Sequence, residues 1–286
     1  MDKIDVVYIL RNNGTRWMDN EIKYSIRALE QNIKFGKLWI VGGCPKFIDK
    51  SKIRYIKAED PFSNKLKNAI HKITLACREE EVSENFILMN DDFFFLKRTE
   101  GVEYFNKGKL EASKKNHSTK GGYYYRAICD TIEMLKDMGI DNPTDFEVHY
   151  PIIFNKKKFI KTVEKISVEE GYLFRSVYGN MNHIESKYRR DVKVYKMDQF
   201  KRYRVKDFMS TDEKIVTDIK FQKWIDKRFK LKSGFENTPQ PAYTCEEVFE
   251  YNGHKYNKGD IILEKIPESI VRSAGLKRIN RVFYGQ

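Results

Sequence analysis

The chain has 286 residues, of which 41% are apolar and 14% aromatic, enough for one large packed domain or for one domain with an appendage. Its modest Gly and Pro content excludes a disordered or collagen-like chain, and without an apolar run of ~18 residues no membrane span is expected. The sequence enters a strand-like segment at once, with no signal-peptide layout, so we expect a cytoplasmic protein. The four cysteines are scattered and are expected to be buried free thiols: Cys44, Cys77, Cys129 and Cys245.

Positive charge is concentrated in the second half of the chain. The formal net charge is +13, and residues 151–235 carry 22 Lys and Arg against 11 Asp and Glu. Such a segment favours a polyanionic partner, for example a nucleic acid, an anionic glycan or an acidic lipid surface. The alternative is a Lys-rich composition whose charges are simply solvated.

The first ninety residues alternate between strand and helix patterns. Short apolar runs predict strands, and apolar residues at helical spacing predict helices. The strands are expected at Ile4–Leu10, Lys37–Val41, Ile53–Ala58 and from Phe86 onward, and the helices at Asp19–Asn32 and Ser63–Arg78. This order is typical of an α/β fold with a mostly parallel central sheet flanked by helices.

The rest of the chain is less regular. Residues 97–122 are expected to form a polar excursion across the active face, and Leu173–Asn180 to end in a Gly-Asn turn. The other expected elements are helices at Tyr123–Met138, Asn155–Lys165 and Asp218–Phe229 (Ile219, Trp224 and Ile225 facing inward), an extended segment at Asp145–Pro151, an edge strand at Asp191–Tyr195 and a strand at Asp207–Thr211. After a linker at 237–242, an Asn252-Gly253 turn predicts a hairpin within Glu247–Leu263, and a short helix is expected at Ile266–Ile279. We therefore expect two domains, 1–236 and 243–286, the second a small α+β appendage.

The stretch FILMNDDFFFL, Phe86–Leu96, holds the strongest chemical signal. Asp91 and Asp92 follow a buried apolar run, and two adjacent carboxylates there are costly to desolvate without a partner. A divalent cation such as Mg²⁺ or Mn²⁺ is the usual partner, and ligands of open α/β sheets bind at the carboxyl ends of the strands. The pair therefore indicates a metal site that can hold a diphosphate, although the same residues can also simply begin a turn.

Further candidates lie elsewhere in the chain. His149, in the segment DFEVHYP, can join Asp91 and Asp92 as a metal ligand or can act as a base. Arg175 and Lys72 are candidates for contacting phosphate oxygens. The sequence contains neither a P-loop nor a GxGxxG fingerprint, so an ion held by the aspartates would have to neutralise the diphosphate.

A series of segments spans about residues 4–236 in a fixed order: IDVVYIL, DNEIKYSIRALEQN, KLWIVGG, NAIHKI, SENFILMNDDFFFL, FEVHYPIIF and DFMSTDEKIVTDIKFQKWIDKRFKLKSGFE. In this order they resemble the Stealth family of capsular polysaccharide and sugar-phosphate transferases. A group of phage-borne glycosyltransferases shows the same arrangement. The resemblance implies a GT-A-like fold, a nucleotide-sugar donor such as a UDP-sugar, and a divalent metal.

Matched position by position, Asp91 and Asp92 fall on the family's NDD pair, and His149 falls on its third-region histidine. The resemblance implies metal or diphosphate contacts for the pair and a catalytic role for Asp92, His149, Arg175 and Asp212. The donor crevice is expected to involve Arg11, Asn13, Asn20, Glu21, Tyr24, Arg27, Asn68, Lys72 and Asn90.

The chain also departs from the family pattern. Ile9-Leu10-Arg11 stands where the family has Trp-Val-Asp, and Lys67 stands where it has an acid. Two outcomes therefore stay open, transfer of a glycosyl group or transfer of a sugar-1-phosphate, to an acceptor hydroxyl on an anionic polymer such as a polysaccharide or modified DNA. The competing hypothesis is a nucleic-acid-binding module on an inactive scaffold, suggested by the basic half and by Tyr195, Tyr203 and Phe208.

Overall fold

The structure is a computed structural model that describes residues 3–119, 121–166, 171–237, 242–244, 247–251, 253–258, 261–262, 266–274 and 276–279. The chain forms two compact units, one of residues 1–45 and 50–233 and the other of residues 46–49 and 234–286. Each is described separately below. The domain limits expected from the sequence, 1–236 and 243–286, stay a prediction.

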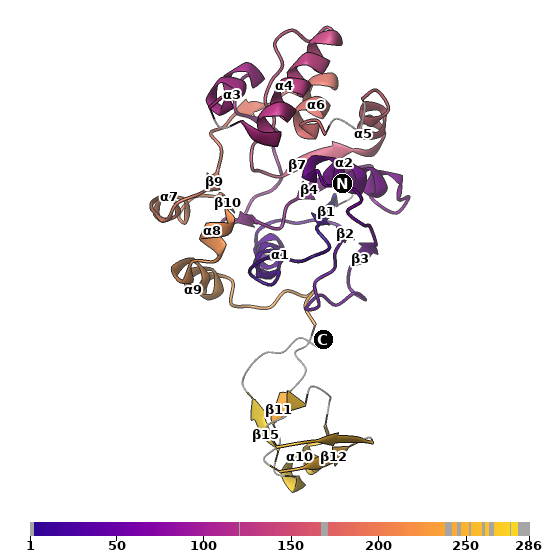
Figure 1. The fold of residues 1–286 in the computed structure, drawn as a ribbon, viewed down its shortest axis with the longest axis vertical. Coiled ribbons are helices and arrows are strands. Elements are labelled where there is room, and N and C mark those ends of the chain that lie inside the picture. Colours follow the sequence, from indigo (N-terminus) through magenta and orange to yellow (C-terminus); the bar gives the residue numbers. More distant parts are fainter. Residues whose placement is uncertain are drawn as a thin grey trace. The chain divides into compact units, whose positions relative to one another are not determined.

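A five-stranded sheet forms the centre of the first unit (Figure 1). In spatial order its strands are β3 (Arg54–Ile56), β2 (Leu38–Gly42), β1 (Asp5–Leu10), β4 (Asn85–Met89) and β7 (Ile152–Asn155). The first four run parallel to one another, and only β7 is antiparallel to its neighbour β4. The carboxyl ends of β1, β2 and β4 therefore lie along one edge of the sheet.

Helices cover both faces of this sheet. Side chains alternate between the two faces along each strand, and the strand residues on both faces are buried. Val7 of β1 packs into a core with α2 (Lys65–Arg78). The next residue, Tyr8, points to the other face, where its hydroxyl lies 2.8 Å from that of Ser25 in α1 (Asn20–Asn32). The predicted α/β class, with a mostly parallel central sheet flanked by helices, is confirmed.

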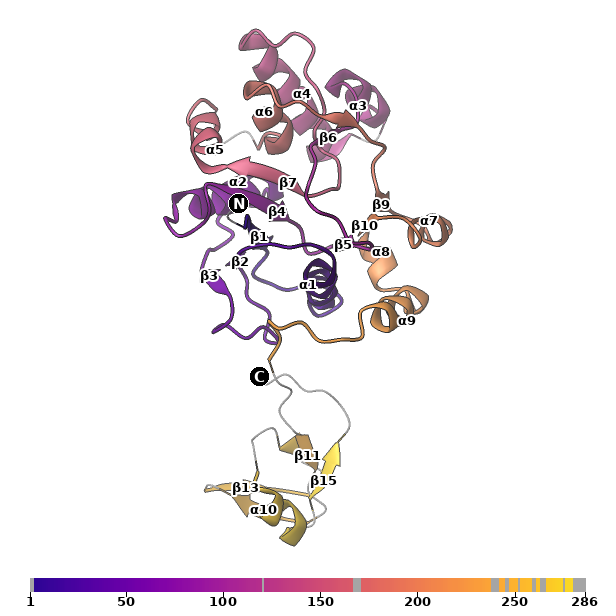
Figure 2. The ribbon, with the colours of Figure 1, turned by 180° about the vertical axis from the view of Figure 1, so that it is seen from behind.

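The aromatic half of the Phe86–Leu96 stretch does not continue the strand. Asn90, Asp91 and Asp92 turn the chain, and β5 (Phe93–Phe95) enters a second sheet. There β5 pairs antiparallel with β10 (Phe208–Thr211), which pairs parallel with β9 (Lys193–Val194). Figure 2 shows this small sheet beside α1. All three phenylalanines are buried, so the turn is held at both ends by strands that belong to packed sheets.

The remaining elements of the first unit surround these two sheets. They are β6 (Phe105–Asn106), α3 (Leu110–His117), α4 (Gly122–Asp137), α5 (Lys156–Val163), α6 (Phe174–Met181), β8 (Lys187–Tyr188), α7 (Met197–Tyr203), α8 (Glu213–Val216) and α9 (Ile219–Arg228). The described part of 97–122 thus contains a helix and a short strand where a polar excursion was expected. No helix in the described ranges has the length and apolar character needed to cross a membrane.

Two local predictions are wrong. Leu173–Asn180 was expected to end in a turn, but α6 runs through Gly179. A Cβ at that glycine would lie 2.5 Å from the Phe146 ring, so Gly179 permits close packing instead of a turn. Ile219, expected to face inward, is 59% exposed at the start of α9, whereas Ile225 is fully buried.

The second unit contains small antiparallel sheets. Its elements are β11 (Ala242–Thr244), β12 (Phe249–Tyr251), β13 (His254–Tyr256), β14 (Ile261–Ile262), α10 (Glu268–Ser273) and β15 (Lys277–Ile279). The predicted hairpin is confirmed as β12 paired with β13, with Gly253 at a φ of 77°. Asn252 lies outside the described residues. The helix expected at Ile266–Ile279 ends early, because its last residues form β15.

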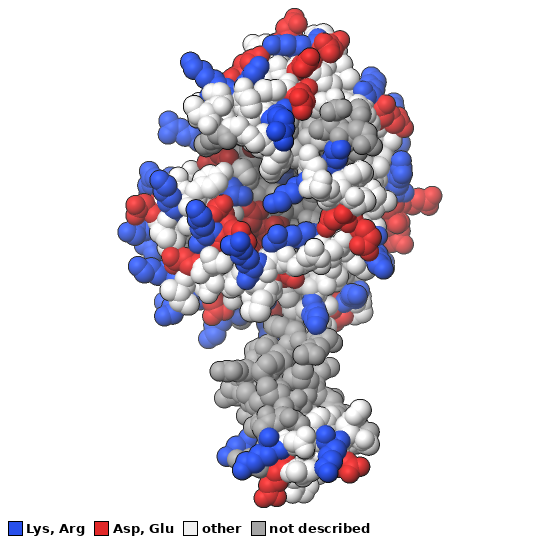
Figure 3. Space-filling model, viewed as in Figure 1, with Lys and Arg blue, Asp and Glu red and all other residues white. Residues whose placement is uncertain are grey.

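The predictions for the cysteines and for the surface charge can be compared with the structure. Cys77 is a buried free thiol and Cys44 and Cys129 are half-buried free thiols, while Cys245 lies outside the described residues. Basic side chains are spread over the face shown in Figure 3, with acidic ones between them. Of the aromatics suggested for nucleic-acid stacking, Tyr195 is 48% exposed, whereas Phe208 is only 1% exposed and belongs to the core.

Candidate functional site

The turn after β4 carries the two aspartates at the carboxyl edge of the central sheet. Asp91 is half-buried, and its carboxylate accepts no hydrogen bond from any described residue. Burial, together with the charges of Asp92 and Glu21, raises its pKa to about 7. Asp92 is instead paired, because its Oδ2 accepts a hydrogen bond of 2.7 Å from Ser210 and lies 3.3 Å from the Lys193 ammonium. The turn therefore holds one unsatisfied carboxylate and one partly neutralised carboxylate.

A small cleft lies between the loop after β1 and this turn. Its walls include Arg11, Thr15, Gly43 and Asp91. A Cβ on Gly43 would come within 2.4 Å of the Arg11 carbonyl oxygen, so the absence of a side chain lets the two strand-end loops approach each other. Thr15 donates a 2.6 Å hydrogen bond to the buried Glu21. Two residues predicted to contact the nucleotide-sugar donor therefore lie here. Arg11 lines the cleft with Asp91, and Glu21 is bonded to Thr15 in the cleft wall.

A larger cavity of about 540 Å³ opens on the other side of the turn. Asn90 lines it, together with His149, Arg175, Glu147 and Asp191. The two cavities are therefore separated by the aspartate turn, with Asn90 facing one and Asp91 facing the other. A volume of this size lies within the range of small-molecule sites, roughly 300–1,000 Å³.

His149 is held on the wall of the larger cavity by Asp191. The imidazole Nδ1 lies 2.7 Å from Asp191 Oδ2, and the His149 backbone N–H donates to Asp191 Oδ1 at 3.1 Å. Burial by itself would raise the pKa of Asp191, but the hydrogen bond and charge of His149, with Lys107 nearby, hold it at about 2. Asp191 is therefore an anion that accepts a hydrogen bond from the Nδ1–H of His149.

Asp191 and Lys193 lie two residues apart on the extended segment that forms β9, so their side chains share one face. Asp191 contacts His149 while Lys193 contacts Asp92, and this segment therefore connects the histidine to the aspartate turn. Tyr195, the next residue on that face, also lines the larger cavity. The alternation in the sequence predicted an edge strand here but not that its polar face lines the site, so Asp191 and Lys193 were not among the predicted site residues.

Arg175 is buried beneath the cavity wall with half of its guanidinium unused. Its Nη1 donates to the carbonyl oxygens of Val148 and Tyr150, at 3.1 and 2.5 Å. Its Nη2 is buried and has no hydrogen-bond partner among the described residues. Glu147 lines the same cavity, and burial raises its pKa although the charge of Arg175 opposes this. Burial lowers the pKa of Arg175, and the charges of Glu147 and Asp92 oppose this shift. A buried N–H donor without a partner is costly.

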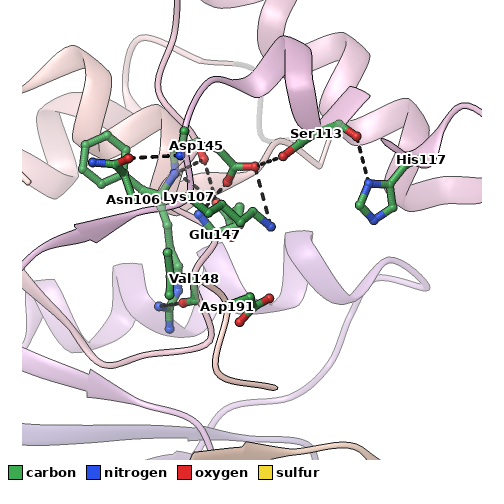
Figure 4. A network of polar contacts seen from close by, with 12 residues as sticks. Asn106, Lys107, Ser113, His117, Asp145, Glu147, Val148 and Asp191 are labelled. Carbon is green, nitrogen blue, oxygen red and sulfur yellow. Dashed lines mark hydrogen bonds and ion pairs between the residues drawn. The ribbon is translucent and has the colours of Figure 1, made fainter. Parts of the chain in front are cut away.

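A second polar network lies at the wall of the larger cavity (Figure 4). Asp145 is fully buried, accepts a hydrogen bond from the Ser113 hydroxyl, and lies 3.6 Å from the Lys107 ammonium. The Ser113 hydroxyl ties α3 into this network, and within α3 the Nδ1 of His117 lies 2.9 Å from the Ser113 carbonyl oxygen. Lys107 and His117 both line the cavity. The network therefore fixes a cationic side chain at the cavity wall.

The structure does not gather the three predicted metal ligands. Within the described ranges, no three His, Cys, Asp or Glu side chains cluster in a way that could hold a metal, and His149 lines the larger cavity whereas Asp91 lines the small cleft. The two aspartates still fit a magnesium ion of the kind held by one or two carboxylates together with substrate phosphates. The unpartnered carboxylate of Asp91 is the observation that favours this fit. His149 is better placed as a base than as a ligand.

Other predicted donor contacts serve the fold. Tyr24 donates a 2.8 Å hydrogen bond to Asp226, and Arg27 donates to the Phe229 carbonyl oxygen at 3.0 Å, so both fasten α1 to α9. Asn68 bonds the backbone N–H and carbonyl of Phe62 at 3.0 and 2.7 Å. These side chains are directed into packing contacts.

The last group of predicted residues is Lys72 in α2, Asp212 before α8, Asn13 in the loop after β1, and Asn20 at the start of α1. Lys72 is buried and donates to the carbonyl oxygen of Leu10 and to Asp60, at 2.6 and 2.5 Å. Asp212 caps α8 through the N–H of Lys214. Asn13 is exposed in the loop after β1, and Asn20, the first residue of α1, donates to the Trp17 carbonyl oxygen. Their roles as donor contacts or catalytic groups stay predictions.

No family model matches the sequence, and no curated protein matches it. Solved structures with a similar fold include the galactosyltransferase LgtC in complex with donor and acceptor sugar analogs, with a TM-score of 0.45 and 12% identity over 79% of this chain and 94% of that one. An active-site mutant of LgtC gives a TM-score of 0.40 at 12% identity over 81% and 85% of the two chains. Mouse xyloside xylosyltransferase 1 gives 0.35 at 8% identity over 82% and 96%. At these values the likeness says nothing about substrate or mechanism.

Proposed function

We propose that the chain is a metal-dependent nucleotide-sugar transferase of the GT-A type. It would move a glycosyl or sugar-1-phosphate unit from a nucleotide-diphospho-sugar, such as a UDP-sugar, to an acceptor hydroxyl. The observation that carries this proposal is the aspartate turn, which presents Asp91 to one cavity and Asn90 to another at the carboxyl edge of the sheet. In open α/β folds this edge is where ligands bind.

Each part of the site has a role in this proposal. Asp91 and Asp92 would hold Mg²⁺ or Mn²⁺, which when bound neutralises the diphosphate leaving group. Arg175 would direct its unpartnered Nη2 at the charge that develops on the phosphate. His149 would accept the proton of the acceptor hydroxyl. The acceptor is expected to be anionic, because Lys65, Lys107 and Arg175 outnumber Glu147 and Asp191 among the Lys, Arg, Asp and Glu side chains that line the larger cavity.

The cleanest test replaces Asp91 by Asn. Since the carboxylate of Asp91 accepts no hydrogen bond from a described residue, and burial disfavours its charge, this change should not destabilise the fold. We expect the wild-type protein to melt at a higher temperature with a sugar nucleotide and Mn²⁺ or Mg²⁺, and to turn the sugar nucleotide over. Asp91→Asn should lose the metal-dependent part of the shift and about a hundredfold or more in turnover.

A matched control is Asp198→Asn. Asp198 forms an exposed ion pair with Lys201, and its side chain is 90% exposed, so the same chemical change is made away from both cavities. This variant should bind and react like the wild type. Wild-type behaviour in Asp91→Asn, or the absence of any sugar-nucleotide-dependent shift in the unmodified protein, would refute the proposed function.

The nucleic-acid hypothesis has less support from individual side chains. Phe208 is buried, and the Tyr203 hydroxyl donates to the backbone of Asp191, which leaves Tyr195 as the exposed ring of the three. The net charge of +13 remains as its motivation, although acidic side chains lie among the basic ones on the face in Figure 3. Salt-sensitive DNA binding without sugar-nucleotide binding would favour this function over transfer.

A further inference from the structure

We propose that Asp191 is a positioning residue that acts through His149, and that the two form a dyad which activates the acceptor hydroxyl. This inference rests on the proposed function and deepens it, since it assigns the base and implies that the acceptor attacks directly. Asp191 lies 42 residues from His149 in the sequence and is brought to it by the fold.

The first argument is geometric. Both oxygens of the Asp191 carboxylate are used to orient the histidine segment: Oδ2 lies 2.7 Å from the ring Nδ1, and Oδ1 accepts the backbone N–H of His149. Oδ1 also lies 3.4 Å from the backbone nitrogen of Lys193, which ties the carboxylate to its own strand. A carboxylate with this many partners cannot rotate freely, so the ring orientation is fixed.

The second argument concerns the proton on the imidazole. Asp191 accepts hydrogen bonds but cannot donate one while it is ionised, so the Nδ1 of His149 must carry the proton. In the neutral ring the other nitrogen, Nε2, is then a bare acceptor. Nε2 has no hydrogen-bond partner among the described residues, and His149 lines the larger cavity. The ring is thus prepared to take a proton from a ligand in that cavity.

The third argument is the charge that surrounds the pair. The charged and titratable side chains that line the cavity with His149 are Asp191, Glu147, Arg175, Lys65, Lys107, His117, Tyr123, Tyr124 and Tyr195. Asp191 stabilises the imidazolium that forms when His149 accepts a proton, whereas Arg175 and Lys107 stabilise the opposite charge that develops on the reacting groups. The negative charge of Asp191 therefore lies beside the base, and the positive charges of Arg175 and Lys107 lie beside the reacting groups.

The proposed step balances as a single displacement. The acceptor O–H bond breaks and its proton passes to Nε2 of His149. The acceptor oxygen forms a bond to the anomeric carbon or to the sugar-bearing phosphorus of the donor. The bond from that atom to the leaving oxygen breaks, and the nucleotide leaves with the electron pair.

The kinetic test is a double-mutant cycle. Asp191→Asn keeps the size of the side chain but removes its charge, and it should lower kcat by about 10²-fold or more with little change in KM. Because Asp191 acts through His149, the same substitution should have almost no effect in a His149→Ala background. Asp191→Glu should recover part of the loss. The matched control is Asp207→Asn, which removes an acid paired with Arg189 outside the cavity and should keep wild-type kcat.

A second measurement does not depend on turnover. Nitrogen-15 NMR of the imidazole rings, assigned with a His149→Gln variant, should show His149 protonated at Nδ1 and bare at Nε2, and Asp191→Asn should abolish this preference.

Three results would overturn the dyad: the opposite tautomer in the wild type, unchanged kcat in Asp191→Asn, or an equal loss with and without His149. If no sugar nucleotide binds while the tautomer is as expected, the proposed function fails and the Asp191–His149 geometry stands.

Discussion

Replacing Arg175 by Lys separates the structural role of this side chain from its role in the site. Arg175 is 5% exposed, and its two terminal nitrogens behave differently. Nη1 is occupied by the carbonyl oxygens of Val148 and Tyr150, whereas Nη2 has no partner within the described part of the chain. Lysine keeps the positive charge but has a single compact ammonium group, which cannot occupy both places.

The structure sets the size of both effects. A hydrogen bond to a charged group contributes about 1.5–3 kcal/mol, so losing one carbonyl contact should lower the free energy of unfolding of Arg175→Lys by roughly that amount. If Nη2 contacts developing phosphate charge, its loss should cost a further factor of about 10²–10³ in kcat, as for the loss of one donor from an oxyanion hole.

Urea denaturation measures the first effect, and steady-state transfer from a sugar nucleotide measures the second. Arg189→Lys is the matched control, because Arg189 also makes structural contacts but does not line the larger cavity. It donates to Asp207 at 3.0 Å and lies over the rings of Phe105 and Tyr150. It should lose stability but keep kcat. Arg175→Lys with reduced stability and full kcat would show that Nη2 does not meet substrate charge.

Two other predictions follow from the placement of single residues. Tyr24→Phe removes the hydrogen bond to Asp226, so the free energy of unfolding measured in urea should fall by about 1 kcal/mol, while sugar-nucleotide affinity should stay the same; a large loss of affinity would return Tyr24 to the donor site. The folded-state pKa of Asp191, about 2, lies below its ordinary value of 3.8, so Asp191 stabilises the fold fully above pH 4 to 5, and this contribution, about 2 kcal/mol, is lost as the pH falls toward 2. Acid unfolding curves of Asp191→Asn should lack this component, and identical curves for the two proteins would contradict the assignment.

Local patterns in the sequence were sufficient for much of the α/β framework. The helices α1 and α2 and the strands β1, β2 and β4 lie within about two residues of the predicted ranges, because each is set by the spacing of apolar residues along a short stretch. The same reasoning placed Asp91 and Asp92 at a strand end, since an apolar run that stops at two acids marks its own boundary.

The tertiary structure decided which side chains meet. Tyr24 and Arg27 bond to Asp226 of α9 and to Phe229, the residue after it, and the three phenylalanines after Asp92 leave the central sheet for a second one. The pairing of His149 with Asp191 joins segments 42 residues apart. Periodicity along the chain specifies which face of an element is buried, but the partner of a polar side chain depends on which distant segment packs beside it, and that is determined only when the whole chain has folded.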